Sequence, residues 1–253
     1  MLLALTPAHA QTKLPPHVGS DGPTVPVIYI EQSGSLGPGA GDIKVKTCRA
    51  VCQPPVHAKP CRVDGNPARE GEYMARNWRA AEASARYSET WSLAQENADV
   101  CTLKLIMVPL LIIHSFDGTA STTININLDR GEGTRRVNKG KGLLGIDSAK
   151  GVAALRASGY APAGTGRYAG YTCQLLRKED GDLVQEACLL DDPKAPARAA
   201  GIAVHLMPLA TSMMNKTVPE GRIHSATTQV NFDATAPAAL FTPPPNIRLK
   251  DVK

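Results

Sequence analysis

Hydrophobic and polar positions alternate along several stretches of the chain, and each stretch predicts a β-strand. One run, Cys101–Ser115, is almost wholly apolar and fits a strand buried on both faces. It is followed by Asp117-Gly118, a turn pair, and then by a partner strand in which Ile124 and Ile126 would face inward. The strands predicted in this way are Val25–Gln32, Ile43–Thr47, Cys101–Ser115, Ala120–Leu128 and Arg222–Phe232.

The segment Gly170–Asp191 (GYTCQLLRKEDGDLVQEACLLD) predicts a complete β-hairpin with a cysteine near each end. Asp180-Gly181 lies at its centre, and this pair is favoured in two-residue hairpin loops because both loop positions need a positive φ. Counting outward from the pair places Cys173 opposite Cys188. A disulfide between them would close a short loop and add roughly 3 kcal/mol to the stability.

Apolar residues at helical spacing predict two or three helices. The clearest starts with Asn66 as N-cap and Pro67 at the first helical position, and continues through Met74 and Trp78. The helices predicted are Asn66–Ala85, Asp147–Ala157 and Pro196–Met207, the last kinked or split at Pro208 before continuing to Asn215. At least seven strands with segregated helices indicate an α+β fold with a single, mostly antiparallel sheet.

The composition fits one turn-rich domain. The 253 residues include 22 glycines and 20 prolines, and only 4% are aromatic. We expect a signal-peptide remnant at residues 1–10, a flexible lead-in at 11–24 and a single β-rich domain at 25–247. The most apolar run, Leu105–Ile113, contains Pro109 and is too short to cross a bilayer, so no integral membrane segment is expected. A net charge of +5 is weaker than nucleic-acid binding usually needs, so no nucleic-acid partner is expected.

The cysteines indicate an oxidising compartment, because there are six of them, an even number. The protein is therefore expected to be periplasmic or secreted. Besides Cys173 and Cys188, four cysteines remain, namely Cys48, Cys52, Cys61 and Cys101. They can pair in three ways, and a bond from Cys48 or Cys52 to Cys101 is favoured, since it would fasten an irregular loop to the buried strand.

A metal site is an alternative use of the same loop. The residues Cys48, Cys52, His57 and Cys61 supply three thiols and an imidazole, a set that zinc would accept in tetrahedral geometry and whose thiolates suit copper(I). A second possible group of soft ligands consists of His205, Met207, Met213 and Met214, although methionine at such positions is more often core filler.

Catalytic patterns are absent from the sequence. It contains no G-x-S-x-G elbow, no H-E-x-x-H and no phosphate-binding P-loop. His114, Ser115 and Asp117 are residue types that could supply a nucleophile and a base, but as neighbours on a strand end they alternate faces and would not form a triad by themselves. A non-enzymatic protein without a cofactor is therefore expected. The glycine-rich basic segment Asp129–Gly142 predicts a loop in which Arg135 and Arg136 could bind lipid headgroups or phosphate.

The C-terminal half resembles the periplasmic lipoprotein-carrier-like superfamily of half-open β-barrels. The resemblance rests on the basic loop, the strand Gly170-Tyr171-Thr172-Cys173, a return strand, a small-residue helix and a closing Phe241-x-x-Pro244. It implies a curved half-barrel packed against two or three helices, with an apolar or lipid-like ligand in its concave face. The lining residues expected from it are Ile106, Val108, Leu110, Ile112, Leu206 and Met213. The partners expected are a lipid or other apolar ligand and envelope proteins.

Two readings without such a ligand stay open. The expected lining residues could form a filled core, in which case the protein would be a disulfide-stabilised structural or accessory protein of the cell envelope. The other is the metal-binding envelope protein, with zinc or copper held by the cysteine loop.

Overall fold

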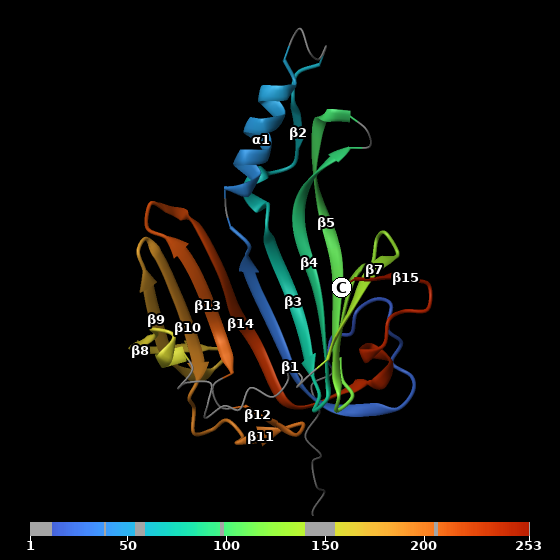
Figure 1. The fold of residues 1–253 in the computed structure, drawn as a ribbon, viewed down its shortest axis with the longest axis vertical. Helices are drawn as coiled ribbons and strands as arrows, with labels where there is room; N and C mark the ends of the chain where they lie inside the picture. The colour runs from blue at the N-terminus through green and yellow to red at the C-terminus, as the bar shows by residue number, and fades with distance from the viewer. Residues whose placement is uncertain are drawn as a thin grey trace, which may run out of the picture.

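The computed structural model describes residues 12–37, 39–53, 59–96, 99–139, 155–204 and 207–252. Its elements in chain order are β1 (Thr24–Ser35), α1 (Ala40–Val51), β2 (Arg62–Asp64), η1 (Pro67–Arg69), β3 (Glu72–Arg79), β4 (Ala83–Glu96), β5 (Asp99–Phe116), β6 (Ala120–Asn127), β7 (Glu132–Lys139), β8 (Ala161–Tyr168), β9 (Tyr171–Asp180), β10 (Leu183–Leu190), β11 (Arg198–Ala199), β12 (Ile202–Ala203), β13 (Pro208–Asn215), β14 (Val218–Pro237), η2 (Ala238–Phe241) and β15 (Arg248–Asp251). The described chain is mostly β, as Figure 1 shows.

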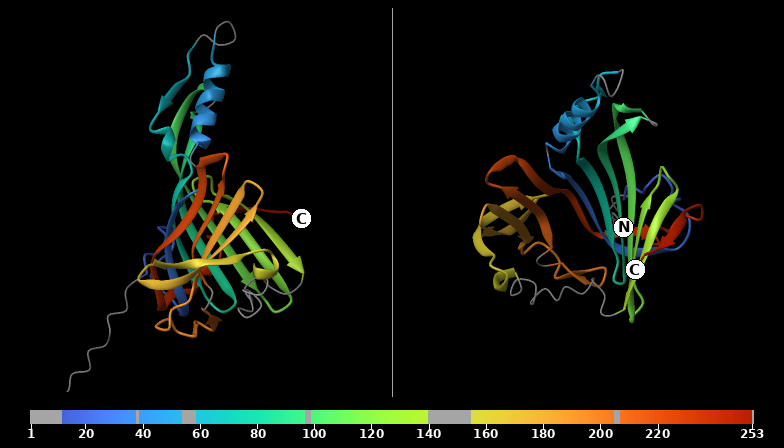
Figure 2. Two further views of the ribbon diagram at one scale, coloured as in Figure 1. Left: turned by 90° about the vertical axis from the view of Figure 1, so that its left-hand side faces the viewer. Right: turned by 45° about the horizontal axis from the view of Figure 1, so that its top comes forward.

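One large sheet of 13 strands organises the molecule, in the order β15-β7-β6-β5-β4-β3-β1-β14-β13-β10-β9-β8, with β2 paired to β5 beside this path. Its pairs are antiparallel except β2 with β5 and β15 with β7. The sheet is strongly curved (Figure 2), but its edge strands β15 and β8 are not paired with each other, so it stays open. Strands β11 and β12 form a separate small hairpin.

The two faces of the sheet between β1 and β7 differ in what covers them. Pairing is regular from β1 through β3, β4, β5 and β6 to β7, so the side chains of each row share a face. One face, here the covered face, buries Tyr29, Trp78, Leu111 and Ile126, together with Leu240 from η2. Val18, Phe241 and Leu249 pack against the same cluster, so both ends of the described chain close it. The opposite face, here the open face, carries the alternate residues.

A second core joins the other half of the sheet to β1. Ile28 and Ile30 of β1 pack with Phe232 of β14 and with the Cys173–Cys188 disulfide of the β9–β10 hairpin. Ala199 and Val204, at and after the small β11–β12 hairpin, complete this core.

Helix α1 and strand β2 stand beyond the main body of the sheet at one end (Figures 1 and 2). Val45, Cys48 and Cys52 recur on one side of α1 and pack against Leu93 and Leu103 of β4 and β5. Disulfides Cys48–Cys61 and Cys52–Cys101 fasten this projection, so the favoured bond from the loop to the buried strand is confirmed. The name projection is used below for residues 39–53 and 59–66. No helix in the described ranges is long and apolar enough to cross a membrane.

The predicted α+β half-barrel packed against two or three helices is wrong. In the described chain helical structure is confined to α1, two short 3₁₀ helices and residues 155–157, and the sheet forms its cores with chain ends, loops and its own curvature. Two predicted helices are strands. Asn66–Ala85 is helical only over η1, and Pro196–Met207 with its extension to Asn215 becomes β11, β12 and β13. Of the third, Asp147–Ala157, residues 147–154 lie outside the described chain, and residues 155–157 are helical.

Burial explains these errors. In β3, Tyr73, Ala75 and Asn77 are buried while Met74 is exposed, so burial recurs at every second residue, as in a strand. The helix was predicted instead because Met74 and Trp78 are four residues apart, which is also a helical spacing. The opposite error occurs at the predicted strand Ile43–Thr47, which lies inside α1 because burial there recurs at Val45, Cys48 and Cys52. Asn66 does act as a cap, since its side-chain oxygen accepts a hydrogen bond from the Ala68 N–H at 3.0 Å.

The two hairpins predicted from Asp-Gly pairs are present, whereas a predicted opening hairpin of Val25–Gln32 with Ile43–Thr47 is wrong because the second segment is helical. Asp117 lies at the turn between β5 and β6, where its carboxylate accepts hydrogen bonds from the backbone of Thr119 and Ala120. In the β9–β10 hairpin the register differs from the prediction, because Gly181 and Asp182 form the loop and Asp180 pairs with Leu183. Gly181 has a φ of 58°, as the first position of a tight hairpin loop requires. Cys173 and Cys188 are therefore diagonal neighbours, and their Cα atoms lie 5.3 Å apart.

Candidate functional site

The open face carries a pocket of about 420 Å³ over strands β3, β4 and β5. Its polar lining comes from alternate positions of adjacent strands, because paired residues of a regular sheet point to the same side. The lining residues are Leu36, Tyr73, Asn77, Arg79, Ser84, Ala85, Arg86, Ser88, Thr90, Leu110, Ile112 and His114. The pocket thus combines cationic and hydroxyl groups from β3 and β4 with apolar side chains from β5.

Two arginines distinguish this pocket. Arg79 pairs with Ser84 and Arg86 pairs with Asn77, so the two guanidinium groups are diagonal neighbours on one face. Burial lowers the pKa of Arg79, and the positive charge of Arg86 lowers it further. Arg86 lies over the ring of Tyr73, with 5.4 Å between the guanidinium carbon and the ring centroid. No described carboxylate forms an ion pair with either arginine.

His114 borders the same pocket from β5. Its Nδ1 lies 2.9 Å from the hydroxyl oxygen of Thr123, and burial lowers its pKa, so the ring is neutral at neutral pH. Asn77 is buried and donates a hydrogen bond to the Gln32 side-chain oxygen at 3.1 Å. The neutral polar groups are therefore positioned, whereas no hydrogen bond to another described side chain occupies the guanidinium donors of Arg79 and Arg86.

The structure places the residues of the predicted apolar lining on separate strands. Ile106, Val108, Leu110 and Ile112 occupy alternate positions of β5, share the open face and are partly buried. Leu110 and Ile112 line the pocket itself. Met213 lies on β13 beside Gln185, away from these strands, and Leu206 lies outside the described residues.

Arg135 and Arg136 lie in strand β7 and not in a loop as predicted. Their side chains point to opposite faces, because they are consecutive residues of one strand. Arg135 forms a bidentate ion pair with Asp251, at 2.7 and 3.1 Å, and is thereby occupied. Arg136 is exposed and continues the row of His114 and Thr123 on the open face.

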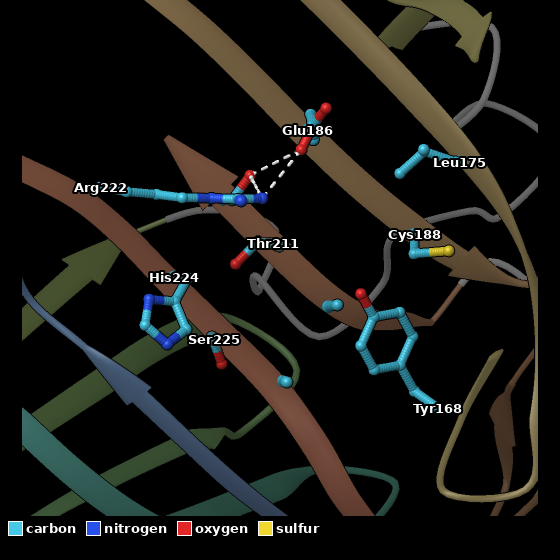
Figure 3. A pocket seen from close by; sticks show the side chains of 11 residues that line it. Tyr168, Leu175, Glu186, Cys188, Thr211, Arg222, His224 and Ser225 are labelled. Atoms are coloured by element: carbon cyan, nitrogen blue, oxygen red, sulfur yellow. Dashed lines mark hydrogen bonds and ion pairs between the residues drawn. The ribbon is translucent and has the colours of Figure 1, made fainter. Parts of the chain in front are cut away.

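A second hollow, of about 300 Å³, lies over β8, β9, β10, β13 and β14 (Figure 3). There the Glu186 carboxylate accepts hydrogen bonds from Ser212 at 2.9 Å and from Arg222 at 3.1 Å. Arg177 lies 3.8 Å from the same carboxylate. Each charge in this hollow has an opposite charge beside it, so these residues act mainly as a bridge across strands β9, β10, β13 and β14.

The predicted cysteine metal site is not available. Cys48 and Cys52 are both in disulfides, as is Cys61, so no thiol remains to bind zinc or copper, and His57 lies outside the described residues. No group of three or more metal-binding side chains is found within the described ranges. Met207, of the second group considered, is buried in the core, and His205 lies outside the described residues.

Sequence reasoning missed Arg79 and Arg86, since both fall in or beside the segment predicted to be helical. The signal was present in β4, where Ser84, Arg86, Ser88 and Thr90 alternate with the covered-face residues Ala85, Tyr87 and Glu89. A strand interpretation of that period would have placed the arginines on one face with hydroxyl groups.

Comparisons with known proteins do not assign a family. No family model and no curated protein matches the chain. Among solved structures, two of PNGF-II, in the P21 and C2 space groups, are similar over 90% of this chain. Their TM-scores are 0.41 and 0.39 and their sequence identities 12% and 11%. The chain spans about a third of their length, 32% and 31%, and likenesses at this level carry no inference about its fold or function.

Proposed function

We propose that the protein binds an amphipathic anion on the open face, with the anionic group between Arg79 and Arg86 and the apolar part along β5. The observation that carries this proposal is the pair of adjacent guanidinium groups, which have no carboxylate partner in the described chain. Both arginines are partly buried, and withdrawing a cation from water costs free energy unless an opposite charge compensates it. A bound carboxylate, sulfate or phosphate would compensate both arginines through charge-assisted hydrogen bonds.

The apolar half of the ligand follows from the neighbouring strand. Leu110 and Ile112 line the pocket beside the arginines, and Val108 and Ile106 extend the same row along β5. Partly exposed apolar side chains in a row give an alkyl chain a surface to cover. The ligand class is thus lipid-like, as expected from the sequence, with the added requirement of a negative charge. The three disulfides support a site of action in an oxidising compartment, the periplasm or the cell exterior, and the proposed role is binding without catalysis.

Isothermal titration calorimetry of the full chain with decanoate tests this function. Decanoate is expected to bind, whereas acetate, which lacks the chain, and decylammonium, which has the opposite charge, are expected to bind far more weakly. The double variant Arg79→Gln/Arg86→Gln should weaken decanoate binding by about 10-fold to 100-fold, the value of one or two hydrogen bonds to a charged group.

Arg76→Gln is the matched control, because Arg76 lies on the same strand but faces the covered side, over the ring of Tyr87. It should leave decanoate binding unchanged. Equal binding of decanoate and decylammonium, or an equal loss in Arg76→Gln, would contradict the proposal and favour a structural protein without a small ligand.

A further inference from the structure

The outer side of helix α1 carries an apolar stripe that no described element covers. Ile43 is 66% exposed and Val51 is 45% exposed, and Thr47 and Ala50 lie exposed between them. These four positions follow helical spacing, so they form one stripe beside the packed residues Val45, Cys48 and Cys52, and most of it borders a groove between α1 and the strand ends. The name outer stripe is used for Ile43, Thr47, Ala50 and Val51.

The outer stripe continues across a groove of about 680 Å³ onto the ends of β4 and β5. Val51 and Val100 both line this groove, and Val100 is 36% exposed. Leu36, at the base of α1, is 58% exposed. Large exposed apolar side chains therefore gather at the projecting end of the molecule, which is a signal of an interaction surface.

Basic residues outnumber acidic ones in the same region. Residues 39–66 contain five lysines and arginines against two acidic residues, Asp42 and Asp64, in a chain whose whole net charge is +5. Lys44 is bound to Glu70, at 2.6 Å, but Lys46 and Arg49 are exposed on α1, and Lys59 and Arg62 are exposed beyond it. Lys46 lies three residues after Ile43 and four before Ala50, so it borders the outer stripe directly.

We infer that the projection docks on the surface of an anionic lipid bilayer, with the outer stripe inserted at the interface and the basic residues over the headgroups. An exposed apolar stripe bordered by lysine and arginine is the pattern of interfacial helices, and each basic residue near an anionic surface strengthens the attraction. The two disulfides and the small core beneath α1 hold the helix in place, so docking requires no folding of the projection. This inference is independent of the pocket on the open face.

Co-sedimentation of the full chain with vesicles tests the inference. Binding to vesicles of phosphatidylcholine with phosphatidylglycerol is expected to be at least about tenfold stronger than to phosphatidylcholine alone, and to weaken as salt is added. Two double variants, Ile43→Ser/Val51→Ser and Lys46→Glu/Arg49→Glu, should each lose most of this binding. Val218→Ser is the matched control, because Val218 is 47% exposed in the β13–β14 hairpin and lies outside the projection.

Each variant is first checked for full oxidation by a thiol count and for an unchanged melting temperature. Equal binding to both vesicle types, no binding to either, or full binding by Ile43→Ser/Val51→Ser would overturn the inference. So would a dimer in analytical ultracentrifugation that this variant abolishes, since the outer stripe would then belong to an interface between two copies.

Discussion

Arg79 and Arg86 lie diagonally across strands β3 and β4, and the charge of Arg86 lowers the pKa of Arg79. Two like charges held together on a sheet oppose folding unless something else compensates them. Two other arginines do have a carboxylate partner, since Arg135 is paired with Asp251 and Arg222 with Glu186. In the proposed function, a bound anion would compensate this repulsion between Arg79 and Arg86.

The first prediction concerns stability without ligand. Arg86→Gln is expected to change the free energy of unfolding by less than about 1 kcal/mol, because losing the contact with Tyr73, worth about 0.5–1 kcal/mol, is offset by relief of the repulsion on Arg79. Urea denaturation of the ligand-free protein measures this. A loss above about 2 kcal/mol would mean that Arg86 is compensated inside the protein.

The second prediction concerns His114 and pH. Its pKa in the folded protein lies below the ordinary value of about 6.5, because burial disfavours the charged ring. The unfolded chain then binds a proton more readily than the folded one, so stability is full above pH 6.5 and falls as the pH drops from there toward the folded pKa. His114→Asn should flatten this part of the profile, as measured by unfolding at a series of pH values.

The pKa of His114 also tests whether the proposed ligand binds in this pocket. An anion bound between the arginines lies beside His114 in the pocket, so binding should raise the pKa of His114. NMR titration of the ring with and without decanoate measures the change. A pKa that stays fixed while decanoate binds would place the anion away from this pocket.

The parts of the fold that sequence predicted well are those with one dominant periodicity. The β5–β6 hairpin has a long apolar run and an Asp-Gly turn, and it is present as predicted. The predicted strand Arg222–Phe232 is also present, as part of β14, although a register shift opposite Glu31 and Gln32 interrupts its alternation. Prediction from the sequence was wrong where the helix or strand preference of the residues disagrees with the pattern of burial. Pro208–Asn215 contains alanine and two methionines, which favour a helix, but it lies between β10 and β14 and completes their backbone hydrogen bonds as a strand.

The candidate site was predicted only in part for a related reason. Four apolar residues of β5 could be placed on one face, because alternation within a single strand fixes that face. The arginines that give the pocket its charge come from β3 and β4, and their position depends on strand pairing. Strand pairing joins residues far apart in sequence, and it could not be predicted here because the segment Asn66–Ala85 was predicted to be a helix.

The third prediction compares the disulfides of the projection. Cys52–Cys101 joins residues 49 apart in sequence, whereas Cys48–Cys61 joins residues 13 apart. The loop-entropy relation gives about 4 kcal/mol for the longer loop and about 3 kcal/mol for the shorter one. Cys52→Ser/Cys101→Ser should therefore lower the unfolding free energy by about 1 kcal/mol more than Cys48→Ser/Cys61→Ser. Denaturation of the two double variants under identical conditions measures the difference, and the reverse order would show that packing around Cys48 outweighs loop length.

The fourth prediction concerns Gly166 of β8, which lies against the Cys173–Cys188 disulfide. A Cβ at this position would come within 2.8 Å of the Cys188 sulfur and 3.3 Å of the Cys173 sulfur. Because the disulfide belongs to the second core and is buried, neither sulfur can move away freely. Gly166→Ala is expected to destabilise the protein by about 1–3 kcal/mol through overpacking. Thr165→Ala, at the exposed neighbouring position of β8, should change the stability by less than about 0.5 kcal/mol.

A double-mutant cycle identifies the disulfide as the cause. In a Cys173→Ala/Cys188→Ala background both sulfur atoms are gone, so the added methyl group has room and the cost of Gly166→Ala should fall by at least about half. An unchanged cost in that background would mean that the glycine is needed for the backbone of β8 and not for the space it leaves. If the coupling is found, the glycine and the two cysteines act as one unit, in which the absence of a side chain on β8 lets the disulfide lie between the curled edge of the sheet and its core.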